Sequence, residues 1–387
     1  MSGVNFLEKL LDGADVDWRP LGEVLNRTKG TKITAGQMRE LHKEGGPVKI
    51  FAGGKTVAFV NFDDIPEKDI QKEPSIIVKS RGVIEFEYYE SPFSHKNEMW
   101  SYNAKNRALN IKYVYHFLKL NEPHFQGIGS KMQMPQIAIP DTDGFGIPIP
   151  CPDNPQKSLE IQAEIVRILD AFTELTAELT AELTARKKQY NYYLDQLLSF
   201  EEGEVEWKTL GEVVATIKTG KLNANAMVED GEYPFFTCDA SPFRIDSYAF
   251  DTEAIIISGN GSQVGHINYY KGKFNAYQRT YILADCTDEV AMSFLLTYLK
   301  AYLRTYIMQH SKKGSVPYIT MPMLQNFQVP VPSIRKQTEI TFILDKFDAL
   351  TESITEGLPR EIELRQKQYA YYRDLLLSFP KPEEAEA

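Results

Sequence analysis

The residues of this chain that could carry catalysis do not form a recognisable catalytic motif. The segment AGGKT at 52–56 resembles the end of a phosphate-binding loop, but Lys49 stands where that motif requires its first glycine. The segment SGNGSQVG at 258–265 is glycine-rich, yet its spacing is not that of a dinucleotide-binding fingerprint. The Pro-Asp pairs at 140–141 and 152–153 are not followed by the acid-x-Lys pattern of a nuclease. No catalytic site is therefore visible in the sequence.

The side chains that bind metals are scattered along the sequence. The six histidines have no metal-ligand spacing and the three cysteines form no CxxC pair; they are His42, His95, His116, His124, His266 and His310, and Cys151, Cys238 and Cys286. We expect no metal site, no cofactor and reduced cysteines, as in a cytoplasmic protein. No apolar run approaches the roughly 20 residues that span a bilayer. The N-terminal segment has acids where a signal peptide would have a basic and then an apolar region.

Charge is distributed unevenly along the chain. The net charge is −10, but residues 18–150 carry 18 lysines and arginines against 15 acids, and residues 207–332 carry 11 against 11. The excess of acid lies in residues 1–17, 151–206 and 333–387. Neutral to slightly basic blocks between acidic segments can still bind nucleic acid, so the total charge does not exclude that function.

The chain contains an internal repeat. Three segments occur twice: WRPLGEVL (18–25) with WKTLGEVV (207–214), IPIPCPDNPQKSLEIQAEIVRILDAF (147–172) with VPVPSIRKQTEITFILDKF (329–347), and RKKQYNYYLDQLLSF (186–200) with RQKQYAYYRDLLLSF (365–379). The N-terminal LEKLLDG (7–13) also resembles LDQLLSFEEG (194–203). This order is cyclic, and it predicts approximate two-fold symmetry within a single chain.

The repeat divides the chain into two variable blocks within a repeated frame. The expected parts are an N-terminal segment (1–17), a first block (18–150), a first helical segment (151–206), a second block (207–332), a second helical segment (333–379) and a tail (380–387). The blocks share only faint similarity, such as Tyr88-Tyr89 with Tyr269-Tyr270. Two units with one frame but different middles suggest the same task performed on two different targets.

Hydrophobic patterns predict short strands in the blocks and long helices between them. Short β-rich runs with turns between them lie at 47–60, 76–89, 253–258, 266–270 and 280–283, and each block has one aromatic helical stretch, near 111–120 and 290–310. The proline-rich exits IPIP and VPVP should be extended. The long helices that follow carry apolar residues at a spacing of three and four, which predicts that they pack antiparallel as a coiled coil. Gly357-Leu358-Pro359 should kink or split the second helix.

The segment FTELTAELTAELTAR at 172–186 repeats Thr-Ala-Glu-Leu almost three times. A four-residue period is close to one helical turn, so Leu175, Leu179 and Leu183 should lie near one stripe of a helix. The tyrosines in the repeated helices, at 190, 192, 193, 369, 371 and 372, could stack on a base or cation. We expect them instead to pack at the coiled coil or against a partner protein.

The repeated frame and the TAEL segment resemble the DNA-specificity subunits of type I restriction-modification enzymes, in particular the type IC branch. The resemblance covers the whole chain. It implies an α+β fold of two β-rich α/β target-recognition domains, joined by two long antiparallel helices with pseudo-two-fold symmetry. Each domain would read one half of an asymmetric, bipartite double-stranded DNA site, and the helices would set the spacer and bind two methyltransferase subunits. Restriction and translocase subunits would join that core, and the S-adenosylmethionine, ATP and Mg would belong to the partner subunits.

Base recognition needs side chains that donate to and accept from base edges in the major groove. In the first block the candidate contacts are Lys79, Ser80, Arg81, His95, Lys96, Asn97, Ser130, Lys131 and Gln133. In the second block they are Asn260, Ser262, Gln263, Tyr277, Gln278, Arg279, Lys312, Lys313, Ser315 and Tyr318. The candidate phosphate contacts, just after each LGEV, are Lys29, Thr31, Lys32, Lys218, Thr219 and Lys221. For each residue the alternative is a solvated surface position.

One TAEL word adds about 6 Å and a residual twist of roughly 40° to a helix. One base pair adds about 3.4 Å, with a twist near 35°. The twists agree and the rises do not, so the helix would have to lie obliquely to the DNA axis. The resemblance implies that the spacer length changes with the number of these repeats, and we therefore expect residues 173–184 to act as a ruler for the DNA spacer. The alternatives are a duplicated coiled-coil scaffold that binds proteins rather than DNA, and a single-chain methyltransferase or nuclease, which the missing motifs disfavour.

Overall fold

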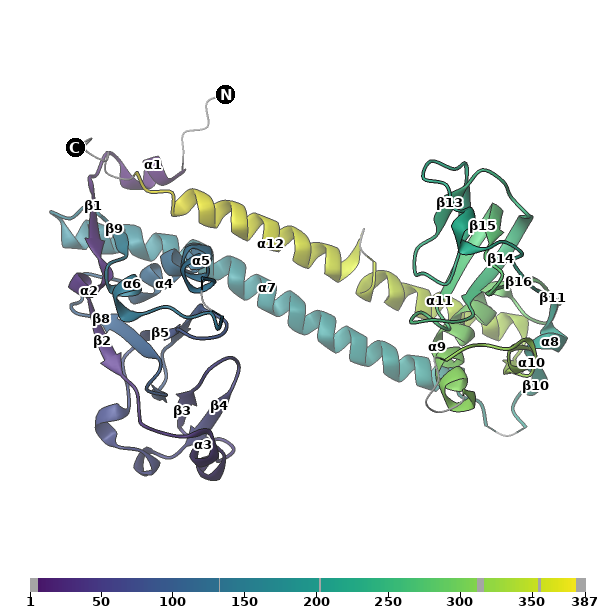
Figure 1. Ribbon diagram of the computed structural model, residues 1–387, viewed down its shortest axis with the longest axis horizontal. Coiled ribbons are helices and arrows are strands. Elements are labelled where there is room, and N and C mark those ends of the chain that lie inside the picture. Colours follow the sequence, from purple (N-terminus) through teal and green to yellow (C-terminus); the bar gives the residue numbers. More distant parts are fainter. Residues whose placement is uncertain (1–5, 132, 202, 312–316, 354–355, 381–387) are drawn as a thin grey trace. The chain divides into compact units, whose positions relative to one another are not determined.

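The computed structural model describes residues 6–131, 133–201, 203–311, 317–353 and 356–380. The chain forms two compact units. Unit 1 comprises Met1–Leu179 and Ile362–Ala387, and unit 2 comprises Thr180–Glu361. The second half of the long helix α7 (Pro155–Leu198) and the helix α11 (Ile334–Thr351) belong to unit 2, and most of α12 (Gly357–Leu376) belongs to unit 1. Figure 1 shows the course of the chain through both units.

The repeated segments close each unit with one antiparallel strand pair. These pairs are β1 (Val16–Pro20) with β9 (Gly146–Pro150), and β10 (Glu206–Thr209) with β17 (Gln328–Val331). Trp18 lies opposite Pro148, and Trp207 lies opposite Pro330. The proline-rich exits are extended, as predicted. The chain therefore enters and leaves each variable block through adjacent strands.

The block of unit 1 contains two sheets. The strand orders are β2-β8-β5-β6 and β4-β3-β7. The strands are β2 (Leu25–Lys29), β3 (Val48–Phe51), β4 (Val57–Val60), β5 (Ser75–Lys79), β6 (Glu85–Tyr89), β7 (Phe93–His95) and β8 (Trp100–Ala104). The α-helices between β1 and β9 are α2 (Leu21–Val24), α3 (Ala35–Leu41), α4 (Ile111–Leu120), α5 (Glu122–Gly129) and α6 (Ile139–Asp143).

The block of unit 2 contains one six-stranded sheet of order β11-β16-β14-β15-β12-β13. The strands are β11 (Val214–Thr219), β12 (Tyr233–Phe236), β13 (Phe243–Ile245), β14 (Phe250–Ser258), β15 (Ile267–Ala276) and β16 (Thr280–Cys286). The helices are α8 (Leu210–Val213), α9 (Met292–His310) and α10 (Met321–Gln325). Each predicted β-rich run contains strand, but the runs at 47–60 and 76–89 each form two strands, β3 with β4 and β5 with β6. The two aromatic helices are confirmed, with boundaries shifted by a few residues.

A buried glutamine of each long helix accepts a hydrogen bond at the N-terminus of the aromatic helix in its unit. The Gln162 side chain accepts a hydrogen bond from the backbone N–H of Asn110, the residue that caps α4 (2.8 Å). Gln337 accepts one from the backbone N–H of Ala291 at the start of α9, also at 2.8 Å. Both glutamines are fully buried. Since a buried N–H without a partner is costly, these bonds fix the aromatic helix to the frame in both units.

Within each unit the long helices pack antiparallel. In unit 1, Phe172 of α7 stacks on Tyr372 of α12 with ring centroids 5.3 Å apart, while Ile165 and Leu169 share a core with Leu376. In unit 2, Lys187 of α7 pairs with Glu352 (2.9 Å), and Tyr190 packs on Phe347 of α11. The second helical segment breaks between α11 and α12, where Gly357 has a φ of +77°. The predicted antiparallel helices and the predicted break are both confirmed.

The TAEL repeats lie in α7 without interruption. Leu175, Leu179 and Leu183 are half-buried, whereas most of the residues between them are exposed. The predicted leucine stripe is therefore present. Among the described tyrosines of the repeated helices, Tyr190 and Tyr369 pack on the cores, while Tyr192 and Tyr371 remain 60% and 64% exposed.

The first and last described segments meet in unit 1. Leu7 and Leu11 of α1 (Phe6–Leu11) lie in the same core as Leu376 and Phe379. The Trp18 indole Nε1 donates a hydrogen bond to the backbone oxygen of Pro380 (2.8 Å). The helical segment that closes each unit therefore comes from two distant parts of the chain in unit 1 and from one continuous part in unit 2. This difference agrees with the cyclic order of the repeat.

Candidate nucleic-acid interface

Four segments of unit 1 meet at one end of its sheets. They are the end of β2 with the residues after it, the loop after β5, the turn between β7 and β8, and the stretch before α6. The Thr31 N–H donates to the His95 carbonyl (2.8 Å), and the Ser80 hydroxyl donates to the Glu98 carbonyl (2.7 Å). The Ile137 N–H donates to the Ser80 carbonyl (3.0 Å). These bonds bring together most of the clusters predicted from the sequence of the first block.

The four equivalent segments of unit 2 also meet. The Gln278 N–H donates to the Leu222 carbonyl (2.9 Å), and the Gly259 N–H donates to the Arg279 carbonyl (2.9 Å). The Ile319 N–H donates to the Gly259 carbonyl (2.8 Å). Although the blocks have little sequence similarity, their loops are therefore held in one arrangement.

A tight turn stands at the centre of each arrangement. In unit 1 the Met99 N–H donates to the Lys96 carbonyl (2.9 Å), and in unit 2 the Thr280 N–H donates to the Tyr277 carbonyl (2.8 Å). A glycine follows the strand beside each turn, at Gly30 and Gly220. A Cβ atom at Gly30 would overlap the carbonyl of His95, and one at Gly220 would overlap that of Ala276. Close approach of two backbones requires glycine at both positions.

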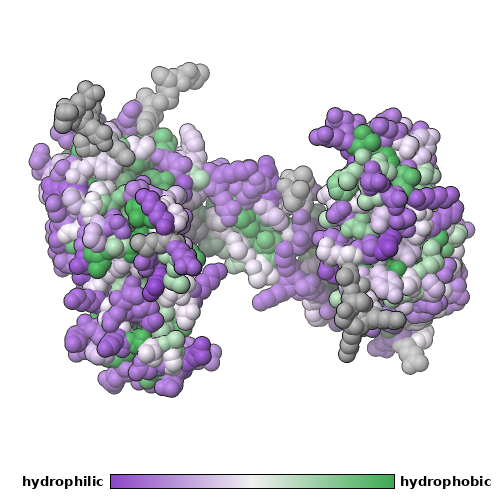
Figure 2. All heavy atoms as spheres, in the orientation of Figure 1, coloured by the Kyte–Doolittle hydropathy of each residue, from purple (hydrophilic) through white to green (hydrophobic). Residues whose placement is uncertain are grey.

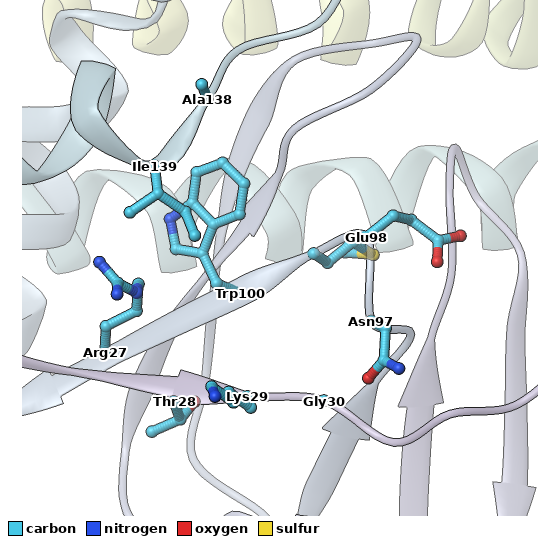
Figure 3. A pocket seen from close by; sticks show the side chains of 10 residues that line it. Arg27, Thr28, Lys29, Gly30, Asn97, Glu98, Trp100, Ala138 and Ile139 are labelled. Carbon is cyan, nitrogen blue, oxygen red and sulfur yellow. The ribbon is translucent and has the colours of Figure 1, made fainter.

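A pocket of about 490 Å³ opens beside the turn of unit 1. Its lining includes Arg27, Asn97, Glu98, Trp100 and Ile139, and Figure 3 shows Trp100 beside Ile139, with Arg27 on one side and Asn97 and Glu98 on the other. Arg27 forms an ion pair with Asp143 of α6, and the Trp100 Nε1–H donates to the Thr142 hydroxyl (3.2 Å). The pocket thus has an apolar floor and charged margins.

Most of the predicted contact residues reach the surface. The exposed ones are Lys29, Lys32, Arg81, Asn97, Ser130, Lys131 and Gln133 in unit 1, and Lys218, Lys221, Ser262, Gln278, Arg279 and Tyr318 in unit 2. Partly exposed are Lys96, Thr219, Asn260, Gln263 and Tyr277. Lys312, Lys313 and Ser315 lie outside the described residues. Hydrophilic side chains cover most of the visible face of each unit, with small hydrophobic areas among them (Figure 2).

Four residues predicted as contacts are buried instead, and we leave them out of the proposed surface. Lys79 pairs with Glu87 (2.8 Å) and with Glu85 (2.5 Å). Burial acts to lower the pKa of Lys79, but these two carboxylates outweigh it and raise the pKa. Ser80 and Thr31 are buried in the backbone contacts described above. All three hold the loops in place.

His95 is the fourth, and its ring is fully buried beneath the turn. Its Nε2 lies 3.2 Å from the Ser101 hydroxyl, and its Nδ1 lies 3.1 Å from the Lys96 carbonyl. Burial lowers the pKa of His95, although the Lys96 carbonyl and the charge of Glu98 oppose that effect. The neutral imidazole therefore supports the turn from within the protein and does not face solvent.

The structure also brings in residues that the sequence did not suggest. Arg27 and Glu98 line the pocket, and Gln136 forms a β-bridge with Arg81. Glu98 was missed because an acid is an unexpected neighbour for phosphates. Its place directly after Lys96-Asn97 was the available signal. No group of acids, histidines and cysteines that could hold a metal occurs among the described residues, and no described helix has the length and apolar character needed to cross a membrane.

Two units with one frame and different polar loops, carried on long helices, define a protein with two recognition modules. The family described as type I restriction modification DNA specificity domain matches residues 14–186 and 202–364. The specificity subunit of the type I restriction enzyme EcoR124I/EcoR124II from Escherichia coli is 40% identical over 410 aligned positions, which cover 99% of each chain. That of EcoprrI, also from Escherichia coli, is 34% identical over 92% of this chain and 93% of that one.

Solved structures show the same fold. The S subunit of a type I restriction-modification system from M. genitalium has a TM-score of 0.66 at 20% identity, and the match covers 96% of this chain and 98% of that chain. The chain belongs to the family of type I restriction-modification DNA specificity subunits. Its function is that of the DNA specificity subunit in such a system.

Proposed function

We propose that each unit reads one half of an asymmetric, bipartite double-stranded DNA site. The observation that carries this proposal is the equivalent meeting of four segments in both units, around turns whose sequences differ. Equivalent loops would present their side chains to DNA in the same way, and different side chains would then select different bases. Exposed basic residues beside the turns, such as Lys29, Lys32 and Lys218, would bind the phosphates.

The repeated helices supply the second part of the proposal. We propose that they bind two copies of a modification methyltransferase and that the TAEL repeats set the length of the spacer between the half-sites. Restriction and translocase subunits would join through the methyltransferase. The exposed Tyr192 and Tyr371, at equivalent places in the repeat, are candidates for contacts with that partner.

The chemistry of the assembly would then belong to the partner subunits. The specificity subunit would direct adenine-N6 DNA methylation and ATP-dependent DNA cleavage without catalysing either reaction. S-adenosylmethionine, ATP and Mg would bind to the partners, and this chain would need no cofactor of its own. We propose that the complex works in the cytoplasm, where its DNA substrate lies.

The decisive experiment is to co-express the chain with its methyltransferase partner and to map methylated adenines across the host genome. We expect one bipartite motif that is absent when this chain is omitted. Methylation at background level, although the two proteins assemble, would contradict the proposal and favour a scaffold that binds proteins only.

The ruler has a separate test. Deleting Thr180–Leu183 removes one TAEL word from α7 and should shorten the preferred spacer by one base pair, with both half-sites unchanged. The matched control is Thr180→Ala, which changes the TAEL word without changing the helix length and should keep the spacer. If the deletion changes half-site letters instead, the repeats do not act as a ruler.

A further inference from the structure

The turns of the two units carry opposite charges at one equivalent position. Glu98 is the third residue of the turn Lys96–Met99, and Arg279 is the third residue of the turn Tyr277–Thr280. The carbonyls of both residues accept a hydrogen bond from the residue after the neighbouring strand, from the Ser80 hydroxyl in unit 1 and from the Gly259 backbone N–H in unit 2. Both turns are thus held at the same carbonyl, whereas the Glu98 side chain accepts hydrogen bonds and the Arg279 side chain donates them.

The Glu98 carboxylate is held in its charged form. The Lys96 Nζ lies 2.6 Å from its Oε1. Burial acts to raise the pKa of Glu98, but the hydrogen bond from Lys96 and the charge of Arg81 outweigh it, so the pKa lies below its ordinary value. The Glu98 side chain is 37% exposed, and its carboxylate keeps free acceptor positions because each oxygen has two. An ionised acid therefore faces solvent among basic residues that would bind phosphates.

Arg279 has the opposite character. Its side chain is exposed, and it has no ion-pair partner among the residues that the structure describes. A guanidinium offers five donors in a fixed planar arrangement and no acceptor. Its neighbours in the turn, Tyr277 and Gln278, carry no charge.

We propose that this shared position of the turn selects the base in each half-site, with Glu98 accepting from the exocyclic amine of cytosine and Arg279 donating to guanine. In the major groove cytosine presents an N4 donor and guanine presents two acceptors, so a carboxylate selects the cytosine side of a G·C pair and a guanidinium selects its guanine side. The inference rests on the proposed function, because it requires that both units read DNA. The positive charges of Lys96 and Arg81 would offset the repulsion between Glu98 and the phosphates.

The test uses the full chain in complex with its methyltransferase partner and reads the genomic methylation motif of each variant. Glu98→Gln is nearly isosteric, but its amide pairs with adenine, so discrimination for cytosine at one position should fall by about 5- to 100-fold. Arg279→Lys keeps the charge and loses the bidentate geometry, so selection of guanine should relax at one position of the other half-site. The control Glu44→Gln alters an exposed acid away from the turn and should change no letter.

The outcomes separate this inference from the function on which it rests. If the unaltered chain yields no bipartite motif, the proposed function fails. If it yields a motif and both turn variants lower methylation evenly without changing any letter, Glu98 and Arg279 only shape the turn, and this inference is overturned. A letter change confined to one half-site for Glu98→Gln, and to the other for Arg279→Lys, supports it.

Discussion

The two units share one strand order, and their most visible difference is that the sheet of unit 1 is divided in two. In unit 2 the ten-residue strand β15 joins β14 on one side and β12 on the other. In unit 1 the corresponding stretch is divided into β6 and β7, with Pro92 between them. Pro92 and Pro74, which directly precedes β5, have no N–H to donate to a ladder, and the pairing of β5 with β6 ends at Ser75 and Tyr89. Strand β3 still pairs parallel with β7, as β12 does with β15.

The comparison shows which contacts maintain the candidate site. The units differ in the division of the sheet, in helix α3 and in their loops. The turn at 96–99 and the turn at 277–280 nevertheless have equivalent hydrogen bonds around them. The closing strand pairs, the capping glutamines and the close glycine approach occur in both units. The frame therefore positions the loops, and the side chains on the loops are free to vary. The following predictions test that division, beginning with the frame.

Gly30→Ala and Gly220→Ala should have the largest effects. A Cβ at either position would overlap the backbone carbonyl of the residue directly before the turn, His95 or Ala276, which cannot move without displacing the turn. Overpacking of this kind costs about 1–3 kcal/mol. We expect each variant to lose selectivity in its own half-site and to leave the other half-site unchanged, as measured from the methylation motif of the assembled complex.

The control for the glycine variants is Gly53→Ala, because a Cβ there has no neighbour within 4 Å and the residue lies in the same block as Gly30. It should change neither half-site. Equal damage to both half-sites by Gly30→Ala would mean that the two units do not act separately.

Gln337→Leu and Gln162→Leu test the capping bond that both units share. Each change leaves a buried N–H at the start of the aromatic helix without a partner, at a cost of about 1–3 kcal/mol. Both amides also donate: Gln337 to the carbonyls of Glu289 (2.7 Å) and Pro332 (2.8 Å), and Gln162 to the Ser158 hydroxyl (2.9 Å) and the Ala108 carbonyl (3.5 Å). The two changes should therefore be similarly damaging, and the shorter bonds of Gln337 should make its loss the greater. Hydrogen exchange of α9 and α4 measures the effect, and the two helices should respond separately. Equal exchange in variant and parent would show that water replaces the glutamine.

The sequence predicted the frame better than the site because the two depend on different kinds of signal. The long helices, the extended proline-rich exits and the aromatic helices follow from periodicity and from proline geometry, which act locally. The break at Gly357 likewise needed only the residues around it. Repetition then supplied the partner for each helix, which a single copy of the pattern would not have identified.

Side-chain burial in the loops could not be read in the same way. Lys79 and His95 are polar residues in plausible contact segments, yet the packing of distant strands encloses them. Lys79 is held by Glu85 and Glu87 across the pairing of β5 with β6, and no sequence pattern indicates the register of that pair. Glu98 became a candidate only when the structure placed it beside Lys96 at the surface.

Acid should destabilise unit 1 more than unit 2, because the two buried histidines lie in unit 1. Burial lowers the pKa of His95 and of His116, although Asp170 opposes this effect at His116. Between the lowered value and about 6.5, the unfolded chain binds more protons than the folded one, so stability falls as the pH falls through this range. Each histidine contributes at most about 1.4 kcal/mol per pH unit.

Hydrogen exchange at pH 7.5 and 5.5, corrected for intrinsic rates, measures this difference. Amides of α4 should lose protection on acidification, and those of α9 should change less. His116→Asn should reduce the loss in α4, because it removes one of the two titrating groups. The same loss of protection in both units would show that the buried histidines do not control acid stability.

Lys29→Ala and Lys218→Ala should have the smallest effects, and the effects should be alike in the two units. Both side chains are exposed on the strand that leads to the close glycine. A phosphate contact adds affinity without selecting a base, so each change should weaken DNA binding by the complex about equally for all sequences. It should also reduce the slope of log affinity against log salt by about 0.9. A change in the base preferred at one position of a half-site would instead show that the lysine contacts a base. That lysine would then not belong to the phosphate contacts that the two units share.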